Sequence, residues 1–265
     1  MTTVRQVAVI LAEAGIASPH HDARVLVNHA DGDAQALDDL VAARASRIPL
    51  QHLTGSAGFR YLDLAVGPGV FVPRPETELL VDAVLSTLEG VANPLVVDLC
   101  AGSGAIGLSV AHEHSRSTVH LVERSDSAFE WLTRNATGQE RVHLHHADLA
   151  AAPIGLDGTV DVVVANPPYV PLDEQTLVDP EVRDHDPAEA LWAGEDGLAV
   201  IRRIVDRATT LLRPGGSLIV EHSERHAQLA PALLVAAGFD EVADHLDLTG
   251  RPRLCIGAYR TELPC

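Results

Sequence analysis

The sequence predicts an α/β fold in which a doubly wound, mostly parallel sheet follows a small helical module. From residue 94 onward, aliphatic runs of strand length alternate with longer runs of helical spacing. Before residue 48, apolar residues recur at helical spacing only, and the turn-like segments SPHH and DGD follow successive runs. The last two runs, EVADHLDL and RLCIGAYR, are strand-like, and we expect them to extend the sheet as a terminal hairpin.

Three regions are expected along the chain. Residues 1–54 form a helical domain. Residues 55–73 form a β-hairpin linker, whose turn lies at Gly67-Pro68-Gly69 ahead of the apolar run Val70-Phe71-Val72. Residues 74–265 form the α/β domain, which opens with PRPET and a helix that starts at Glu76 with acidic residues in its first turn.

Each element of the α/β domain has its own signal. The strands are short aliphatic runs, as expected where helices cover both faces of a sheet: PLVVDL, TVHLVE, RVHLHHA, VDVVVA and GSLIVEH. The helices carry apolar residues three and four positions apart: GAIGLSVAHEH, DSAFEWLTRNA, GLAVIRRIVDRATTLL and AQLAPALLVAAG. Ligands of such folds bind at the carboxyl ends of the strands, so the residues that follow each strand are the candidates for a site.

Composition excludes several classes of protein. The formal net charge of −18, with no concentrated basic patch, disfavours nucleic acid as a partner, because phosphate contacts supply most of that affinity. No apolar run approaches the roughly 20 residues that a membrane-spanning helix needs, and the amino-terminal segment lacks the basic start of a signal peptide. The three cysteines are few and widely spaced, which predicts a reduced, cytoplasmic protein. We expect a monomer without a metal site.

A glycine-rich turn follows the first strand of the α/β domain. Gly102, Gly104 and Gly107 form G-x-G-x-x-G between a strand and a helix, where bare backbone can approach a ligand. Glu123 lies 19 residues beyond Gly104, at the end of the next strand, where an acid can accept hydrogen bonds from both hydroxyls of a ribose. These features alone would also fit a nicotinamide-dependent dehydrogenase.

Two further acids follow strands. Asp98 ends the first strand, and we expect it inside the ligand crevice. A carboxylate fits poorly beside a pyrophosphate, but it suits S-adenosylmethionine, which carries a sulfonium and an ammonium; the alternative role is a cap for the loop. Asp148 follows the strand RVHLHHA, and either contacts an adenine or serves as the cap, just before Leu149, of a helix.

The segment VVVANPPYVP ends a core strand in an amide, two prolines and a phenol. The Asn166 oxygen can accept one N–H of a planar amide or amine, and the Pro167 carbonyl can accept the other. Pro167 and Pro168 fix the backbone that carries these acceptors, and the Tyr169 ring can pack on the flat group. Such a site catalyses by alignment and by stabilising positive charge on nitrogen, without a strong base before transfer. The alternative is a merely structural proline-rich strand exit.

With these residues in place, the α/β domain resembles the class I S-adenosylmethionine-dependent methyltransferases, and the whole chain resembles the PrmC/HemK family. That family methylates the side-chain N5 of the glutamine in the Gly-Gly-Gln motif of peptide chain release factors. The resemblance rests on the segments PLQHLTG, FRYLDLAVGPGVFVPRPETELLV, VVDLCAGSGAIG, VVANPPYVP, EVRDHDPAEALWAGEDGL and LRPGGSLIVE. It implies a Rossmann-like, mostly parallel seven-stranded sheet with an antiparallel terminal strand.

The resemblance also implies roles. Residues 1–54 would recognise the protein substrate. S-adenosylmethionine, which leaves as S-adenosylhomocysteine, would be held by Asp98, Gly102, Gly104, Glu123, Asp148, Leu149, Asn166 and Thr77. The substrate amide would be oriented by Asn166, Pro167, Pro168 and Tyr169, with Phe59 closing the site and Glu181-Val182-Arg183 near its mouth. A release factor is the expected partner.

The chain departs from the family at three places. The helical module before PLQHLTG has only 48 residues, Glu221-His222-Ser223 replaces the usual Glu-Ile-Gly, and Glu123 stands where aspartate is commoner. Two alternatives therefore stay open. The first is a methyltransferase of this fold acting on another protein glutamine, a nucleobase amine or a small-molecule amine. The second is a non-catalytic module that only binds the cofactor.

Overall fold

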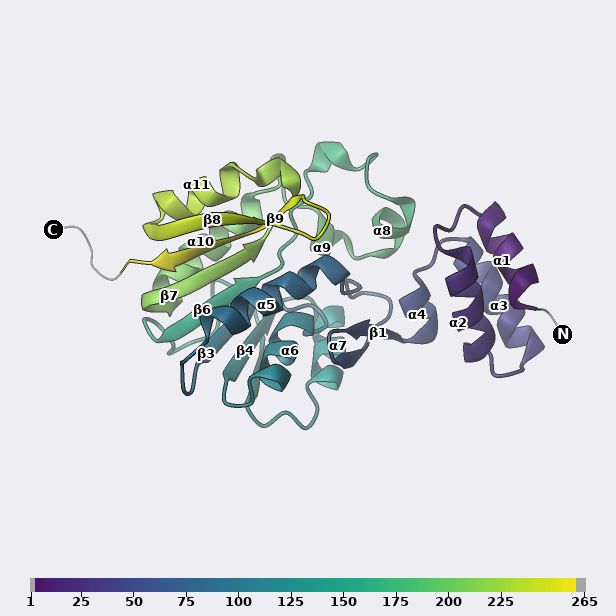
Figure 1. The fold of residues 1–265 in the computed structure, drawn as a ribbon, viewed down its shortest axis with the longest axis horizontal. Helices are drawn as coiled ribbons and strands as arrows, with labels where there is room; N and C mark the ends of the chain where they lie inside the picture. Colours follow the sequence, from purple (N-terminus) through teal and green to yellow (C-terminus); the bar gives the residue numbers. More distant parts are fainter. Residues whose placement is uncertain (1–2, 261–265) are drawn as a thin grey trace.

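The computed structural model describes residues 3–260. Its main sheet has seven strands in the order β5-β4-β3-β6-β7-β9-β8, and β9 alone runs in the direction opposite to the other six. This confirms the predicted fold class (Figure 1). The strands are β3 (Leu95–Leu99), β4 (Thr118–Glu123), β5 (Val142–His146), β6 (Val160–Ala165), β7 (Leu212–Glu221), β8 (Phe239–Leu246) and β9 (Pro252–Tyr259).

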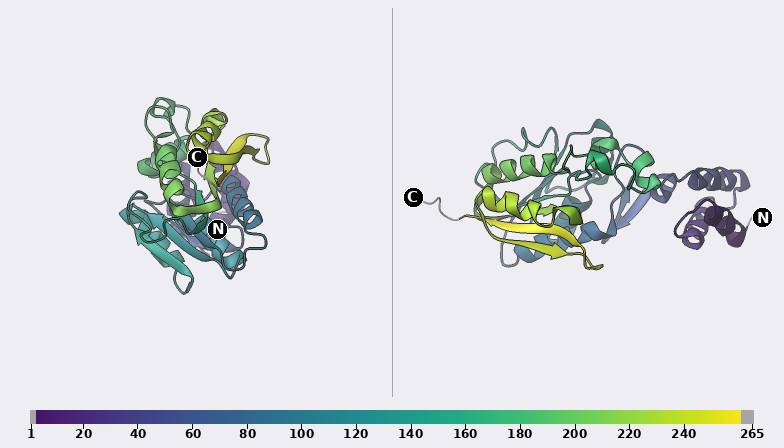
Figure 2. Two further views of the ribbon diagram at one scale, coloured as in Figure 1. Left: turned by 90° about the vertical axis from the view of Figure 1, so that its left-hand side faces the viewer. Right: turned by 90° about the horizontal axis from the view of Figure 1, so that it is seen from above.

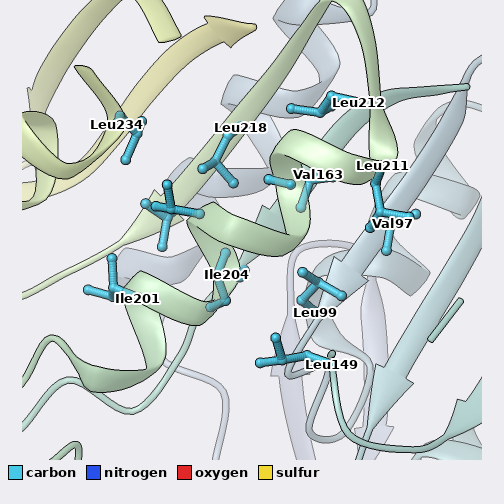
Figure 3. Packing of buried hydrophobic residues seen from close by; sticks show 14 of the residues in the cluster. Val97, Leu99, Leu149, Val163, Ile201, Ile204, Leu211, Leu212, Leu218 and Leu234 are labelled. Atoms are coloured by element: carbon cyan, nitrogen blue, oxygen red, sulfur yellow. The ribbon is translucent and has the colours of Figure 1, made fainter. Parts of the chain in front are cut away.

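Helices cover both faces of this sheet because its strand residues are apolar on both. Val97 of β3 and Val163 of β6 face α10 and α11, whereas their neighbours Val96 and Val162 face α5, α6 and α7. Figure 3 shows side chains of α10 lying against β3, β6 and β7. The helices are α5 (Glu78–Thr87), α6 (Ala105–Glu113), α7 (Asp126–Asn135), α10 (Ala199–Leu211) and α11 (Leu229–Ala236).

The amino-terminal helices form a separate layer with its own core, which contains Leu11, Leu26 and Val41. They are α1 (Val4–Glu13), α2 (Pro19–His29), α3 (Ala34–Ala45) and α4 (Leu50–Thr54). Thr3 begins α1 with a capping box and Asp33 caps α3, so each of these two helices starts where the sequence supplies an oxygen for free backbone N–H groups. The right-hand view of Figure 2 shows this layer at one end of the sheet.

One ion-paired arginine joins these helices to the rest of the protein. Arg44 of α3 is 5% exposed, and its guanidinium contacts Asp22 of α2 at 2.8 Å and Glu181 of α8 (Pro180–His185) at 2.7 Å. Within residues 3–260 no helix combines the length and the apolar character needed to cross a bilayer.

The linker hairpin forms, but not where the sequence predicted its turn. Its strands are β1 (Ser56–Phe59) and β2 (Leu62–Ala65), so the chain turns at Arg60 and Tyr61 instead of Gly67-Pro68-Gly69. Arg60 adopts a positive φ of 50°, and its side chain bonds Glu113 and Asp82, which fixes the turn against two helices. The run 70–72 forms no strand; Val70 and Val72 instead pack beneath the hairpin with Val66.

Candidate active site

A cavity of about 290 Å³ opens at the carboxyl ends of the central strands β3, β4 and β6. Its wall combines residues from the glycine turn, the end of β4 and the segment after β6. Eight of the residues that the sequence singled out line it: Thr77, Gly102, Glu123, Leu149, Asn166, Pro167, Pro168 and Tyr169. The structure therefore brings together, from five separate segments, most of what the sequence assigned to a single site.

The glycine turn and Glu123 are locked together at the cavity wall. One Glu123 oxygen accepts from the Gly102 N–H at 2.8 Å, and the other accepts from the N–H groups of Arg124 and Ser125, each at 2.8 Å. The backbone at residue 102 has a φ of 56°, which residues with a side chain rarely adopt, so glycine is favoured there. Gly104 faces inward, because a Cβ there would lie 2.7 Å from a methyl group of Leu132, so its role is packing rather than lining.

Asp98 does not lie in the crevice, and its expected place there was wrong. It shares the α6-facing side of β3 with Val96, so it is fully buried behind the glycine turn, where its Oδ2 accepts from the Gly107 N–H at 2.9 Å. Its Oδ1 has no hydrogen-bond partner in the described part of the chain. Burial, with a smaller contribution from the negative charge of Glu123, raises the pKa of Asp98 to about 7 against the opposing effect of the Gly107 hydrogen bond.

The two roles weighed for Asp148 are separated by its contacts. Its Oδ1 accepts from the Ala150 N–H at 2.9 Å, which caps a turn rather than a helix. That bond is the main reason why the pKa of Asp148 is lowered, and an ion pair with Arg203 also lowers it. Asp148 does not line the cavity, whereas Leu149 and Arg203 do.

The segment after β6 is held by a hydrogen-bond network that the sequence did not predict. The Asn166 Nδ2 donates to the Thr77 hydroxyl at 3.1 Å, and Thr77 donates to Glu221 at 2.8 Å. The Tyr169 hydroxyl donates to the other Glu221 oxygen at 3.0 Å, and burial raises the pKa of the Tyr169 phenol well above its usual range. The network links the segments around residues 77, 166 and 221, which are far apart in sequence.

Two predicted substrate contacts lie elsewhere. Phe59 is 1% exposed in the core that packs against α5 and α6, so it supports the hairpin and does not close the cavity. Arg183 does not line the cavity and is paired with Asp184 at 2.7 Å on the surface of α8. Val182, which belongs to the same predicted segment 181–183, does line the cavity.

Sequence reasoning missed several lining residues. Arg74 lines the cavity and is paired with buried Asp186 at 2.5 Å, and Glu76 and Glu189 line the same cavity. PRPET contains the arginine and the first of these glutamates, so the signal was present. Nothing in the sequence indicated that residues 186–191 would fold back over the same cavity.

Comparisons with known proteins agree with this geometry. A family model described as the methyltransferase small domain matches residues 67–179. The release factor glutamine methyltransferase of Streptomyces coelicolor is 47% identical, covering 100% of this chain and 99% of its own. That of Mycolicibacterium smegmatis is 46% identical, with 95% of each chain covered.

Among solved structures, the T. thermophilus 16S rRNA N2 G1207 methyltransferase in complex with AdoMet and guanosine is 19% identical. It superposes with a TM-score of 0.52 and covers 79% of this chain and 46% of its own, which shows a common fold. The chain therefore belongs to the family of the release factor glutamine methyltransferases, a family of methyltransferase enzymes.

Proposed function

We propose that the protein transfers a methyl group from S-adenosylmethionine to the side-chain N5 of a glutamine, that of the Gly-Gly-Gln motif in a peptide chain release factor. The observation that carries this proposal is the fixed amide of Asn166. Its nitrogen is engaged by Thr77, and no donor in residues 3–260 bonds its oxygen, which is left for an incoming N–H. The names of the relatives from Streptomyces and Mycolicibacterium support the choice of substrate.

The cavity fits S-adenosylmethionine. The Glu123 oxygen that accepts from Gly102 has one further lone pair for a ribose hydroxyl. It lies beside the bare backbone of Gly102, where no atom lies within 4 Å of the place that a Cβ would take. Apolar Val122 and Leu149 line the neighbouring wall and suit an adenine ring. When bound, S-adenosylmethionine supplies an electrophilic methyl group.

The residues of the chain act on the glutamine amide. An amide nitrogen is a weak nucleophile because its lone pair is delocalised into the carbonyl. Asn166 Oδ1 and the Pro167 carbonyl accept its two N–H bonds and so favour the orientation in which the lone pair faces the methyl donor. Tyr169 packs on the flat amide, and the acceptor oxygens stabilise the positive charge that develops on nitrogen. The proton then leaves to solvent, so no strong base is needed.

Glu123→Gln tests the cofactor part of the proposal. We expect S-adenosylmethionine to bind about tenfold more weakly, because a neutral amide accepts fewer and weaker hydrogen bonds than a carboxylate. Isothermal titration calorimetry measures the change. Asp126→Asn is the matched control: Asp126 is a nearby carboxylate whose side chain is 95% exposed, and its variant should bind like the wild type. Equal affinity for all three proteins would contradict the ribose role of Glu123.

Methyl transfer from labelled S-adenosylmethionine to purified release factors tests the whole proposal. Each factor is tested beside a version whose Gly-Gly-Gln glutamine is replaced by alanine, and label should appear only with the glutamine present. Label on other proteins alone would refute the release-factor substrate while keeping the reaction.

A cytoplasmic location belongs to the same proposal. Two cysteines, Cys100 and Cys255, form no disulfide, which agrees with a reducing compartment.

A further inference from the structure

Glu221 is a buried carboxylate that the methyl transfer described above does not use. It ends β7 and is 1% exposed, so it does not line the cavity and cannot touch substrate. Its two oxygens nevertheless accept from Thr77 and Tyr169, two residues that do line it. Burying an ionisable acid lowers the free energy of unfolding, so a buried acid directly behind a site indicates a role in that site.

The direction of these hydrogen bonds fixes the orientation of a neighbouring amide. An ionised carboxylate only accepts, so both hydroxyls must donate to Glu221. Thr77 has one hydroxyl hydrogen, and once that hydrogen points to Glu221 the oxygen can only accept from Asn166. The atom of Asn166 that lies 3.1 Å away must therefore be the nitrogen, and the amide oxygen is turned away from Thr77.

We propose that Glu221 is a positioning residue, which through the Thr77 hydroxyl holds the Asn166 amide with its oxygen toward the substrate. The inference rests on the proposed function, in which that oxygen accepts an N–H of the glutamine. When Glu221 is protonated on the oxygen that faces Thr77, it donates to the Thr77 hydroxyl, and that hydroxyl becomes free to donate to Asn166. The amide then loses its preference for the productive orientation.

The surroundings of Glu221 place this change within an accessible pH range. Burial raises the pKa of Glu221 to about 7, against the opposing hydrogen bonds from Thr77 and Tyr169. Arg253 of β9 lowers it, and Glu76 of the turn before α5 raises it. The ionised, productive form is thus lost as pH falls through about 7, and the turnover number should fall with it.

Glu221→Gln is the first test. Its amide nitrogen must donate, so one of the two hydroxyls is forced to accept, and we expect kcat to fall about tenfold with little change in KM for S-adenosylmethionine. The acidic limb of the kcat profile near pH 7 should disappear in this variant. Asp98 is the other buried acid whose pKa is raised to about 7, so it is the alternative source of such a limb. The limb should persist in Asp98→Asn if Glu221 is its source. An unchanged profile in Glu221→Gln would overturn the proposal.

Paired variants of Thr77 separate positioning from packing. Thr77→Ser keeps the hydroxyl and should retain wild-type kcat within about threefold, whereas Thr77→Val keeps the shape and should lose about as much as Glu221→Gln. The double variant Thr77→Val/Glu221→Gln should lose no more kcat than either single variant, because both substitutions break the same relay. Asp161→Asn is the matched control for neutralising a carboxylate far from the cavity. Asp161 lies at the end of β6 opposite to Asn166, where it accepts from Leu95 and Arg213, and its variant should keep the acidic limb of the kcat profile. Additive losses would indicate two separate packing defects and contradict the relay.

A measurement without turnover keeps the relay testable if the proposed substrate is wrong. The side-chain amide signal of Asn166, assigned in ¹⁵N-labelled protein by its loss in Asn166→Ala, should shift with pH around a midpoint near 7. This titration should vanish in both Glu221→Gln and Thr77→Val. If it does so while no release factor is methylated, the proposed function fails and the relay stands; a signal that never titrates refutes the relay.

Discussion

Asn166→Ala is expected to lower kcat by about 10² to 10³, the scale for removing one preorganised polar contact from a reacting centre. The variant loses the oxygen that we propose accepts an N–H of the substrate amide, and it also loses the donor to Thr77. The affinity for S-adenosylmethionine should stay nearly unchanged, because the substitution leaves Glu123, the proposed ribose ligand, intact. Rapid-quench measurement of methyl transfer, combined with calorimetry, separates the two effects.

Two outcomes would contradict this account of the amide clamp. Activity that survives within a few-fold would show that the Pro167 carbonyl alone orients the amide. A parallel loss of cofactor affinity would move Asn166 from substrate alignment to cofactor binding. The free energy of unfolding should change by less than in the next variant, because Asn166 is only half-buried.

Gly197→Ala is expected to destabilise the fold by roughly 2–4 kcal/mol, from a left-handed backbone and a steric clash together. Gly197 has a φ of 73°, and a Cβ there would lie 2.5 Å from the Tyr169 carbonyl oxygen and 2.8 Å from the His226 ring. The clash involves backbone, so the segment that carries Pro167 to Tyr169 must shift. Urea denaturation measures the stability loss, and the shifted segment should also lower kcat in the folded fraction.

Gly250→Ala is the control for that substitution. Gly250 has a similar φ of 82°, but nothing lies within 4 Å of its Cβ position. It should cost only the backbone term of about 1–2 kcal/mol. Equal losses in both variants would mean that the close approach of Gly197 to Tyr169 contributes nothing to stability.

Regular elements and strand-end residues could be predicted from the sequence, because their signals are local. Aliphatic runs indicated the strands, and the places of Gly102, Glu123 and Asn166 at the cavity follow from the rule that ligands lie at carboxyl ends of parallel strands. The prediction for Asp98 was wrong because it used only the position of this residue at a strand end. The alternation of side chains along a strand puts Asp98 on the same face as Val96, toward α6 and away from the cavity.

What the sequence could not supply is contact between distant segments. Thr77, Asn166 and Glu221 come together only when α5, β6 and β7 pack, and no periodicity indicates this. The hairpin turn was misplaced because glycine and proline at 67–69 produced a stronger local signal than Arg60, whose turn is stabilised by Glu113 and Asp82 from other elements. Tertiary contacts overrode local preference in both cases.

The position of β9 between β7 and β8 constrains the order in which the sheet can be completed during synthesis. β8 leaves the ribosome first, yet its only neighbour in the sheet is β9, and the free edge of β7 also waits for β9. Until Leu254 is in place opposite Glu221, the strand that carries this acid has an open edge of unpaired backbone groups. The nascent chain therefore carries this aggregation-prone edge until β9 has been made.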